Sequence, residues 1–210
     1  MPEIRIQQIA PDDTPLLDAA VALYRDSIEK SEQRPEPVFR ALINRPDYRF
    51  LAARLDEELV GVAVSWAPED ADFWLFEYIA VAERLRGNNI GANLFVASRL
   101  MAGQERIALV EVDAFTGEEI QAKRLAFYRR LGCRRLAGLD YILPINAFGA
   151  PPPMWLLALA QEENLASVSV MEVEDWLRRI YSEVYLKPLD DARLAAMIDP
   201  LPDDVELVAI

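Results

Sequence analysis

Hydrophobic and polar positions follow two different spacings along this chain. Short apolar runs that suit strands alternate with longer segments in which apolar residues recur every three or four positions, as they do on one face of a helix. Strands are predicted near residues 4–9, 50–54, 59–66, 74–81, 107–112 and 134–142. Helices are predicted near residues 14–28, 38–43, 90–101, 122–131 and 170–184. This alternation predicts an α/β protein.

Two helix starts have clear signals. Thr14 and Pro15 suit the N-cap and the first position of a helix. Ser169 and Glu172 have the spacing of a capping box. The helix behind Ser169 has an apolar stripe, which we expect to pack on its own domain; a dimer contact is the minority alternative. The stripe consists of Val173, Trp176, Leu177, Ile180, Tyr181 and Val184.

One strand leads through a polar loop straight into a helix. The strand is Phe73–Val81, the loop Arg86–Ala92, and the helix is expected to begin near Ile90. Four loop residues tolerate positive φ, so their backbone N–H groups can converge beside the positive end of the helix dipole. They are Gly87, Asn88, Asn89 and Gly91. The loop therefore predicts an anion site, although its sequence is neither a P-loop nor a dinucleotide-binding motif.

Two motifs together resemble the GNAT family of N-acetyltransferases. Arg86-x-x-Asn89-x-Gly91 resembles the family's acyl-CoA pyrophosphate loop, with Asn89 where a glycine is usual. The segment from Ala122 to Cys133 is similar to the family's later helix and strand entry, with Cys133 replacing an aromatic residue. Val110-Glu111-Val112 resembles the strand between them, followed by a linker that is longer than usual.

The resemblance implies a fold and a domain division. We expect a GNAT-type mixed, mostly antiparallel central sheet of about seven strands flanked by helices. Residues 151–159 could begin a helix after three prolines, but a last strand suits the family better. The acyl-CoA N-acyltransferase domain is then expected at residues 1–160. Residues 161–210 are expected to form an acidic helical extension that packs on the same domain or on a partner, and a homodimer is one form that such a partner contact could take.

Composition narrows the chemistry. The 210 residues contain no histidine, which excludes Ser-His-Asp machinery and histidine-ligated metals, and no metal is expected. The net charge is −13, so nucleic acid and anionic membranes are unfavourable partners, whereas a cationic amine is a favourable one. No membrane-length apolar segment or signal peptide stands out in the sequence, and a cytoplasmic location is expected. A single cysteine, Cys133, excludes an internal disulfide.

By resemblance, acetyl-CoA is the cosubstrate. Arg86 and the loop amides would bind its pyrophosphate, and the backbone of the preceding strand would pair with its pantetheine arm. The candidate binding residues are Ile79, Ala80, Val81, Arg86, Gly87, Asn88, Asn89, Ile90, Gly91 and Ala92.

The resemblance also implies the chemical roles. Tyr128 matches the family's acid, which protonates the leaving thiolate, although a core aromatic is the plain structural alternative. Glu77 and Glu111 are rival candidates for the base that deprotonates a primary amine, directly or through water. Residues 32–34 are a hypothetical lining of the acceptor pocket. The predicted reaction is direct attack of the amine within a ternary complex. The alternative is a catalytically silent GNAT-fold module that binds CoA or another protein.

Overall fold

The computed structural model describes residues 4–161 and 165–210. The chain divides into two compact units, and each is described by itself. Unit 1 contains Met1–Gln104 and Ala147–Gly149, and unit 2 contains Glu105–Asn146 and Ala150–Ile210. The predicted boundary near residue 160 is a different division, and it stays a prediction; residues 162–164, close to that boundary, lie outside the described residues.

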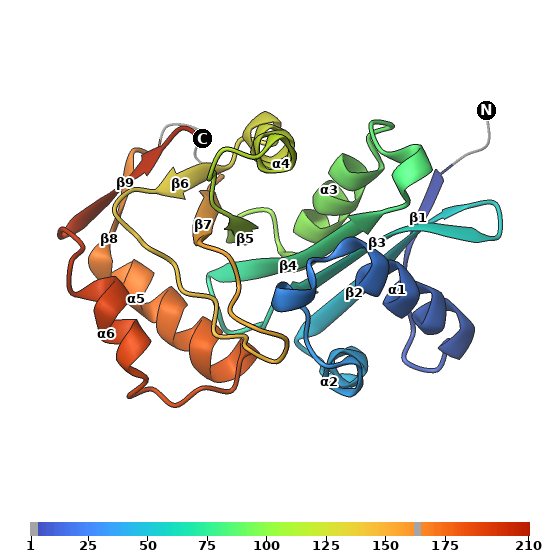
Figure 1. The fold of residues 1–210 in the computed structure, drawn as a ribbon, viewed down its shortest axis with the longest axis horizontal. Helices are drawn as coiled ribbons and strands as arrows, with labels where there is room; N and C mark the ends of the chain where they lie inside the picture. The colour runs from blue at the N-terminus through green and yellow to red at the C-terminus, as the bar shows by residue number, and fades with distance from the viewer. Residues whose placement is uncertain (1–3, 162–164) are drawn as a thin grey trace. The chain divides into compact units, whose positions relative to one another are not determined.

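Unit 1 is an antiparallel sheet in the order β1-β2-β3-β4 with helices on both faces (Figure 1). Its strands are β1 (Ile4–Gln8), β2 (Tyr48–Leu55), β3 (Glu58–Trp66) and β4 (Phe73–Val81). Its helices are α1 (Thr14–Ser27), α2 (Glu36–Ala41) and α3 (Ile90–Ala102), with 3-10 turns η1 (Lys30–Glu32), η2 (Leu42–Asn44) and η3 (Glu83–Leu85). In Figure 1, α3 covers one face of the sheet, and α1 lies on the other.

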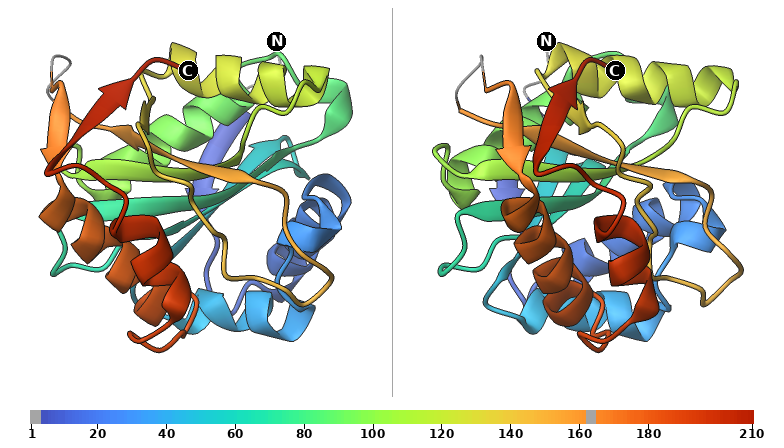
Figure 2. Two further views of the ribbon diagram at one scale, coloured as in Figure 1. Left: turned by 60° about the vertical axis from the view of Figure 1, so that its left-hand side comes forward. Right: turned by 90° about the vertical axis from the view of Figure 1, so that its left-hand side faces the viewer.

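Unit 2 contains a second set of antiparallel pairs, in the order β5-β7-β6-β9-β8. Its strands are β5 (Ile107–Asp113), β6 (Arg134–Leu136), β7 (Met154–Leu159), β8 (Ser167–Ser169) and β9 (Asp204–Val208). Its helices are α4 (Glu119–Arg130), α5 (Val170–Arg179) and α6 (Ala192–Ile198), with a π-helical turn η4 (Ile180–Val184) directly after α5. Figure 2 shows α5 and α6 side by side in both of its views, and the two helices are in contact.

The predicted mixed and mostly antiparallel fold is confirmed, but the described residues form nine strands rather than about seven. The C-terminal extension accounts for the difference, because it contributes β8 and β9 in addition to its helices. The strand predicted at 134–142 is shorter, since β6 ends at Leu136 and Gly138 follows with a φ of +77°.

The two helices with clear start signals begin where the sequence predicts, except that the N-cap of α1 lies one residue earlier. The N-cap of α1 is Asp13 rather than Thr14, because the Asp13 carboxylate accepts the backbone N–H of Leu16. The capping box of Ser169 and Glu172 is present at α5, and residues 154–159 form the expected strand β7. The apolar stripe behind Ser169 is buried, and α5 contacts β8, β9 and α6 of its own unit. A homodimer stays a prediction.

Strand β3 lets α3 approach unit 1's sheet closely at Gly61. A Cβ atom at Gly61 would lie 3.0 Å from Leu94 Cδ1 and 3.1 Å from Ile90 Cγ2, both on α3. Because Ile90 is the first residue of α3, this contact fixes the start of the helix as well as its distance from the sheet.

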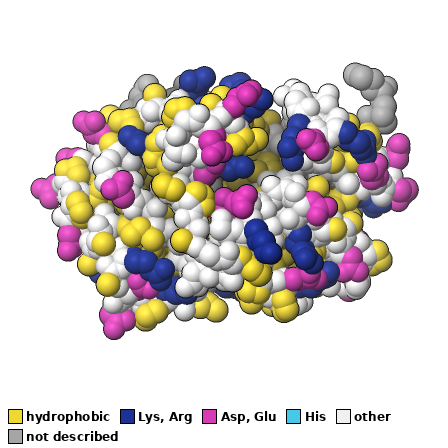
Figure 3. All heavy atoms as spheres, viewed as in Figure 1, with side chains coloured by type: hydrophobic (Ala, Val, Ile, Leu, Met, Phe, Trp, Pro, Cys, Tyr) yellow, Lys and Arg dark blue, Asp and Glu magenta, His cyan; other side chains and the backbone are white. Residues whose placement is uncertain are grey.

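The exposed charges are mixed in sign. On the face drawn in Figure 3, acidic and basic side chains are interspersed over the surface. The acidic excess is largest towards the C-terminus, where residues 151–210 contain 12 acidic and 4 basic residues. No helix within residues 4–161 or 165–210 combines the length and apolar character needed to cross a bilayer.

Replacing Gly61 with alanine should destabilise the protein by about 1–3 kcal/mol, because the added methyl group overpacks the contact with α3. Urea unfolding measures this loss. If crowding is the cause, Leu94→Val should cost less stability in the Gly61→Ala background than in the wild type. Equal costs in both backgrounds would contradict the explanation.

Candidate active site

An extra residue interrupts the pairing of β4 with β3. Val64 lies opposite Tyr78 and Ser65 lies opposite Phe76, so Glu77 has no partner residue in β3. Such a β-bulge bends its strand and leaves the extra residue outside the ladder of hydrogen bonds. Glu77, a predicted site residue, is therefore the centre of the irregularity in β4.

Beyond the bulge, alternate backbone groups of β4 point away from β3. The backbone N–H of Ala82 donates to the Val60 carbonyl of β3 at 2.9 Å. The backbone groups of Ala82 therefore point towards β3. Because backbone groups alternate along a strand, those of Val81 and Ile79 point to the edge opposite β3. The carbonyl of Val81 accepts the Arg86 side chain there, Nε to O, at 3.2 Å.

The loop after β4 has two residues in the left-handed region. Gly87 has a φ of +86° and Asn89 a φ of +60°. The other two residues that tolerate positive φ, Asn88 and Gly91, do not adopt it. The backbone N–H of Asn88 donates to the Leu85 carbonyl and closes a turn, and Gly91 is already part of α3.

Helix α3 begins with free amides. Asn89 is its N-cap but provides no side-chain hydrogen bond, and the first intrahelical bond runs from the Asn93 N–H to the Asn89 carbonyl. The N–H groups of Ile90, Gly91 and Ala92 therefore have no partner within the helix. With the exposed Arg86 nearby in sequence, this arrangement fits an anionic group such as a pyrophosphate.

Glu77 forms a buried ion pair that the sequence did not reveal. Arg34 Nη2 lies 2.7 Å from Glu77 Oε2, and the two side chains are 7% and 0% exposed. The other oxygen, Oε1, is buried without a hydrogen-bond partner among the described residues. Burial, and after it the charge of Glu77, raises the pKa of nearby Tyr48 well above its usual value.

Aromatic residues hold Arg34 in place. The Arg34 backbone N–H donates to the Tyr24 hydroxyl at 2.8 Å. Tyr24 stacks on Phe39 and packs edge-on against Tyr78 of β4. Burial raises the pKa of Tyr24 to about 12, so its hydroxyl stays protonated at neutral pH.

In unit 2, Glu111 accepts hydrogen bonds from two tyrosines. The Tyr185 hydroxyl donates to Glu111 Oε2 at 2.6 Å, and the Tyr141 hydroxyl donates to Oε1. Glu111 is half-buried on β5, between the buried Val110 and Val112. Its carboxylate is thus fixed in orientation by donors on both oxygens.

Tyr128 lies in the last turn of α4. The helix ends in a Schellman motif, in which Gly132 has a φ of +89° and the Cys133 N–H donates to the Tyr128 carbonyl at 3.0 Å. The Tyr128 side chain is 4% exposed, and burial raises the pKa of its hydroxyl above the usual value. The hydroxyl is therefore protonated at neutral pH.

The long linker before α4 is tied to that helix by Gln121. The Gln121 side-chain oxygen accepts the backbone N–H of Thr116 at 2.8 Å and takes part in the capping box with Glu118. At the end of β5, Asp113 pairs with Arg124 of α4. These contacts fix the start of the helix that contains Tyr128.

The structure therefore groups the predicted site residues by unit. Glu77 and the loop residues 79–92 belong to unit 1, whereas Glu111 and Tyr128 belong to unit 2. The residues that sequence reasoning missed as partners are Arg34, Tyr48, Tyr141 and Tyr185. Arg34 lies in the polar segment that had been considered for the acceptor pocket, but its 43-residue separation from Glu77 left no signal of the pairing.

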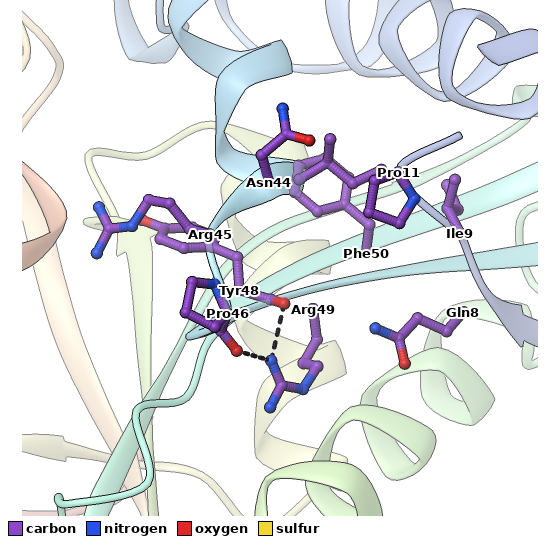
Figure 4. Close-up of a pocket in the computed structure, with 10 residues that line it drawn as sticks. Gln8, Ile9, Pro11, Asn44, Arg45, Pro46, Tyr48, Arg49 and Phe50 are labelled. Atoms are coloured by element: carbon purple, nitrogen blue, oxygen red, sulfur yellow. Dashed lines mark hydrogen bonds between the residues drawn. The ribbon is translucent and has the colours of Figure 1, made fainter. Parts of the chain in front are cut away.

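A separate pocket of about 250 Å³ lies in unit 1 where the end of β1, η2 and the start of β2 meet (Figure 4). Its two arginines are already engaged. Arg45 pairs with Asp47, and Arg49 donates to the carbonyls of Pro46 and Tyr48. Neither the residues of the loop after β4 nor the predicted catalytic residues line it. Within the described part of the chain, no cluster of three or more Cys, Asp or Glu side chains could hold a metal ion.

Arg34→Met should lower the free energy of unfolding by about 3–5 kcal/mol, because it leaves the Glu77 carboxylate buried without its cation. Adding Glu77→Leu should recover much of that loss. Urea unfolding of both variants provides the measurement. Arg84→Met, which removes an exposed pair with Glu58, is the control and should cost less than about 1 kcal/mol. Additive losses in the Arg34 and Glu77 double variant would contradict the explanation.

Solved structures similar to this chain include proteins described as acetyltransferases. A protein assigned to the GNAT family in Bacteroides thetaiotaomicron is 22% identical, with a TM-score of 0.70 over 87% of this chain and 98% of its own. The ribosomal-protein-S18-alanine N-acetyltransferase from Escherichia coli is 16% identical, with a TM-score of 0.57 over 78% and 99%. An aminoglycoside 6'-acetyltransferase type Ii is 22% identical, with a TM-score of 0.56 over 74% and 96%. At these identities the likeness shows the fold alone.

The family itself is shown by the sequence. No curated protein matches the chain. The family model described as acetyltransferase (GNAT) family matches residues 16–133, which is more than half of the chain and includes β4, the loop, α3, β5 and the Tyr128 helix. The chain belongs to the GNAT family of acetyltransferases.

Proposed function

We propose that this protein transfers an acetyl group from acetyl-CoA to a primary amine by direct attack within a ternary complex. The observation that supports this proposal most is the order of three structural features that begin at Glu77. The bulged strand β4, the loop with two left-handed residues and the uncapped start of α3 follow one another within unit 1.

Binding of acetyl-CoA is assigned to this segment. The N–H groups from Gly87 to Ala92 and the Arg86 guanidinium would bind the pyrophosphate. The backbone groups of Ile79 and Val81, which point away from β3, would pair with the pantetheine arm. Ala80, between them, directs its backbone groups towards β3, so we give it no direct contact through its backbone.

The bulge also suggests how the thioester carbonyl is polarised. A backbone amide outside the pairing of β4 with β3 could donate to an oxygen that gains negative charge during attack. Glu77 would then act on the reaction by fixing the bulge through its ion pair with Arg34. We therefore treat Glu77 first as a positioning residue.

Glu111 is our choice for the base. It is half-buried rather than fully buried, and two neutral phenols donate to its carboxylate. The carboxylate would take a proton from the amine, directly or through water. Glu77 stays the rival, because its Oε1 has no partner among the described residues.

Tyr128 is proposed as the acid. The departing thiolate needs a proton, and the buried phenol remains protonated at neutral pH. The reaction then balances: the amine nitrogen bonds to the acetyl carbon, the carbon–sulfur bond breaks, the base takes one amine proton, and the thiolate takes the tyrosine proton.

We propose the chemical class of the acceptor substrate, an amine, and not its identity. Two proteins with this fold act, by their names, on an aminoglycoside and on the alanine of a ribosomal protein, so the same architecture serves small and protein amines. The acidic net charge of −13 favours a cationic acceptor.

Calorimetric titration with acetyl-CoA should give saturable one-to-one binding that ATP does not reproduce. Arg86→Ala should weaken this binding about tenfold, as expected for losing one charge-assisted hydrogen bond. Arg84→Ala is the matched control, two residues away, and should bind normally. Absence of binding at millimolar acetyl-CoA would overturn the proposal. Binding without turnover of any amine would instead support a silent CoA-binding module.

Tyr128→Phe should lower kcat about 100-fold or more, because the leaving thiolate loses its proton donor. Release of free thiol, measured with an amine panel that includes an aminoglycoside and an alanine N-terminal peptide, gives the rate. The acetyl-CoA affinity and the unfolding temperature should change little. An unaltered kcat across the pH range would show that Tyr128 is only a core aromatic.

A further inference from the structure

The C-terminal segment departs from regular geometry just before and just after Tyr185. Helix α5 widens into the π-helical turn η4, and the Tyr185 N–H donates to the Ile180 carbonyl, five residues back, at 3.1 Å. The next residue, Leu186, has a φ of +53° although its side chain is 77% exposed. A π-helical turn is rare, and a positive φ is unfavourable for a leucine.

Tyr185 lies between these two irregularities in the sequence. Its hydroxyl donates to Glu111 Oε2 at 2.6 Å, across 74 residues of sequence. Because π-helical turns and strained residues persist where surrounding contacts require them, the geometry indicates that the Tyr185 hydrogen bond is specified by the fold.

The same segment also fixes the second donor. Tyr141 precedes Ile142, whose N–H lies 3.2 Å from Met197 Sδ of α6 and whose carbonyl accepts the Tyr181 hydroxyl of η4 at 2.5 Å. The backbone beside Tyr141 is thus held by η4 and α6. Tyr185 binds Glu111 directly, and the residues around it orient the other tyrosine.

We propose that Tyr185 is a positioning residue for acetyl transfer, which orients the Glu111 carboxylate towards the amine. This inference rests on the proposed function of Glu111 as the base. It assigns a role in catalysis to Tyr185, which lies beyond the segment that the family model matches, residues 16–133. Glu111 acts on the amine, and Tyr185 acts only through Glu111.

Tyr185→Phe should lower kcat about tenfold while leaving the KM for acetyl-CoA unchanged, because the carboxylate loses the donor that orients it. Ser182→Ala is the matched control: it removes a hydroxyl from the same turn, but that hydroxyl donates to the Arg178 carbonyl. We expect the control to keep the wild-type kcat. Circular dichroism and the unfolding temperature show that each variant is folded.

The decisive measurement repeats Tyr185→Phe in a Glu111→Gln background. If Tyr185 acts through Glu111, the second substitution should have no further effect on kcat. Equal effects in both backgrounds, or an unchanged kcat for Tyr185→Phe alone, would overturn the inference. If Glu111→Gln keeps the kcat of the wild-type protein, Glu111 is not the base and the inference about Tyr185 is overturned. If the wild-type protein acetylates no amine, the proposed function itself is rejected.

Discussion

The extra residue in β4 is the constraint on which unit 1 depends. With Glu77 outside the ladder, the strand pairs with β3 on both sides of a bend rather than in one straight register. The bend leads the chain from an ordinary antiparallel strand into a loop that ends at the exposed start of α3. A buried ion pair is an expensive way to hold such a bend, since both charges lose their hydration. Its presence is understandable if the required property is a single fixed backbone geometry rather than maximum stability.

Local patterns predicted most of this fold because the relevant information is short-range. The left-handed Gly87 and Asn89, the Gly132 helix end and the Ser169 capping box can each be seen within a few residues of sequence. The same holds for the alternating strands, which the pairing of β2 with β3 and of β3 with β4 confirms.

The partners and strands that the sequence did not predict have a common physical origin, which is contact between distant segments. Nothing near Arg34 indicates that it will meet Glu77, and nothing near Tyr185 indicates Glu111. The short strands β8 and β9 are stabilised by pairing with each other and with β6, so their own three or five residues carry little signal. The roles of the candidate residues had to come from resemblance, because side-chain type alone does not separate a catalytic carboxylate from a packed one.

The close approach at Gly61 has a consequence for how this sequence can change. Position 61 shares its space with Ile90 and Leu94, and the first of these begins the helix whose amides form the proposed anion site. A larger residue at position 61 therefore requires the α3 side chains to shift or to become smaller. A substitution at this core position of unit 1 is thus coupled to the placement of the helix start at its surface.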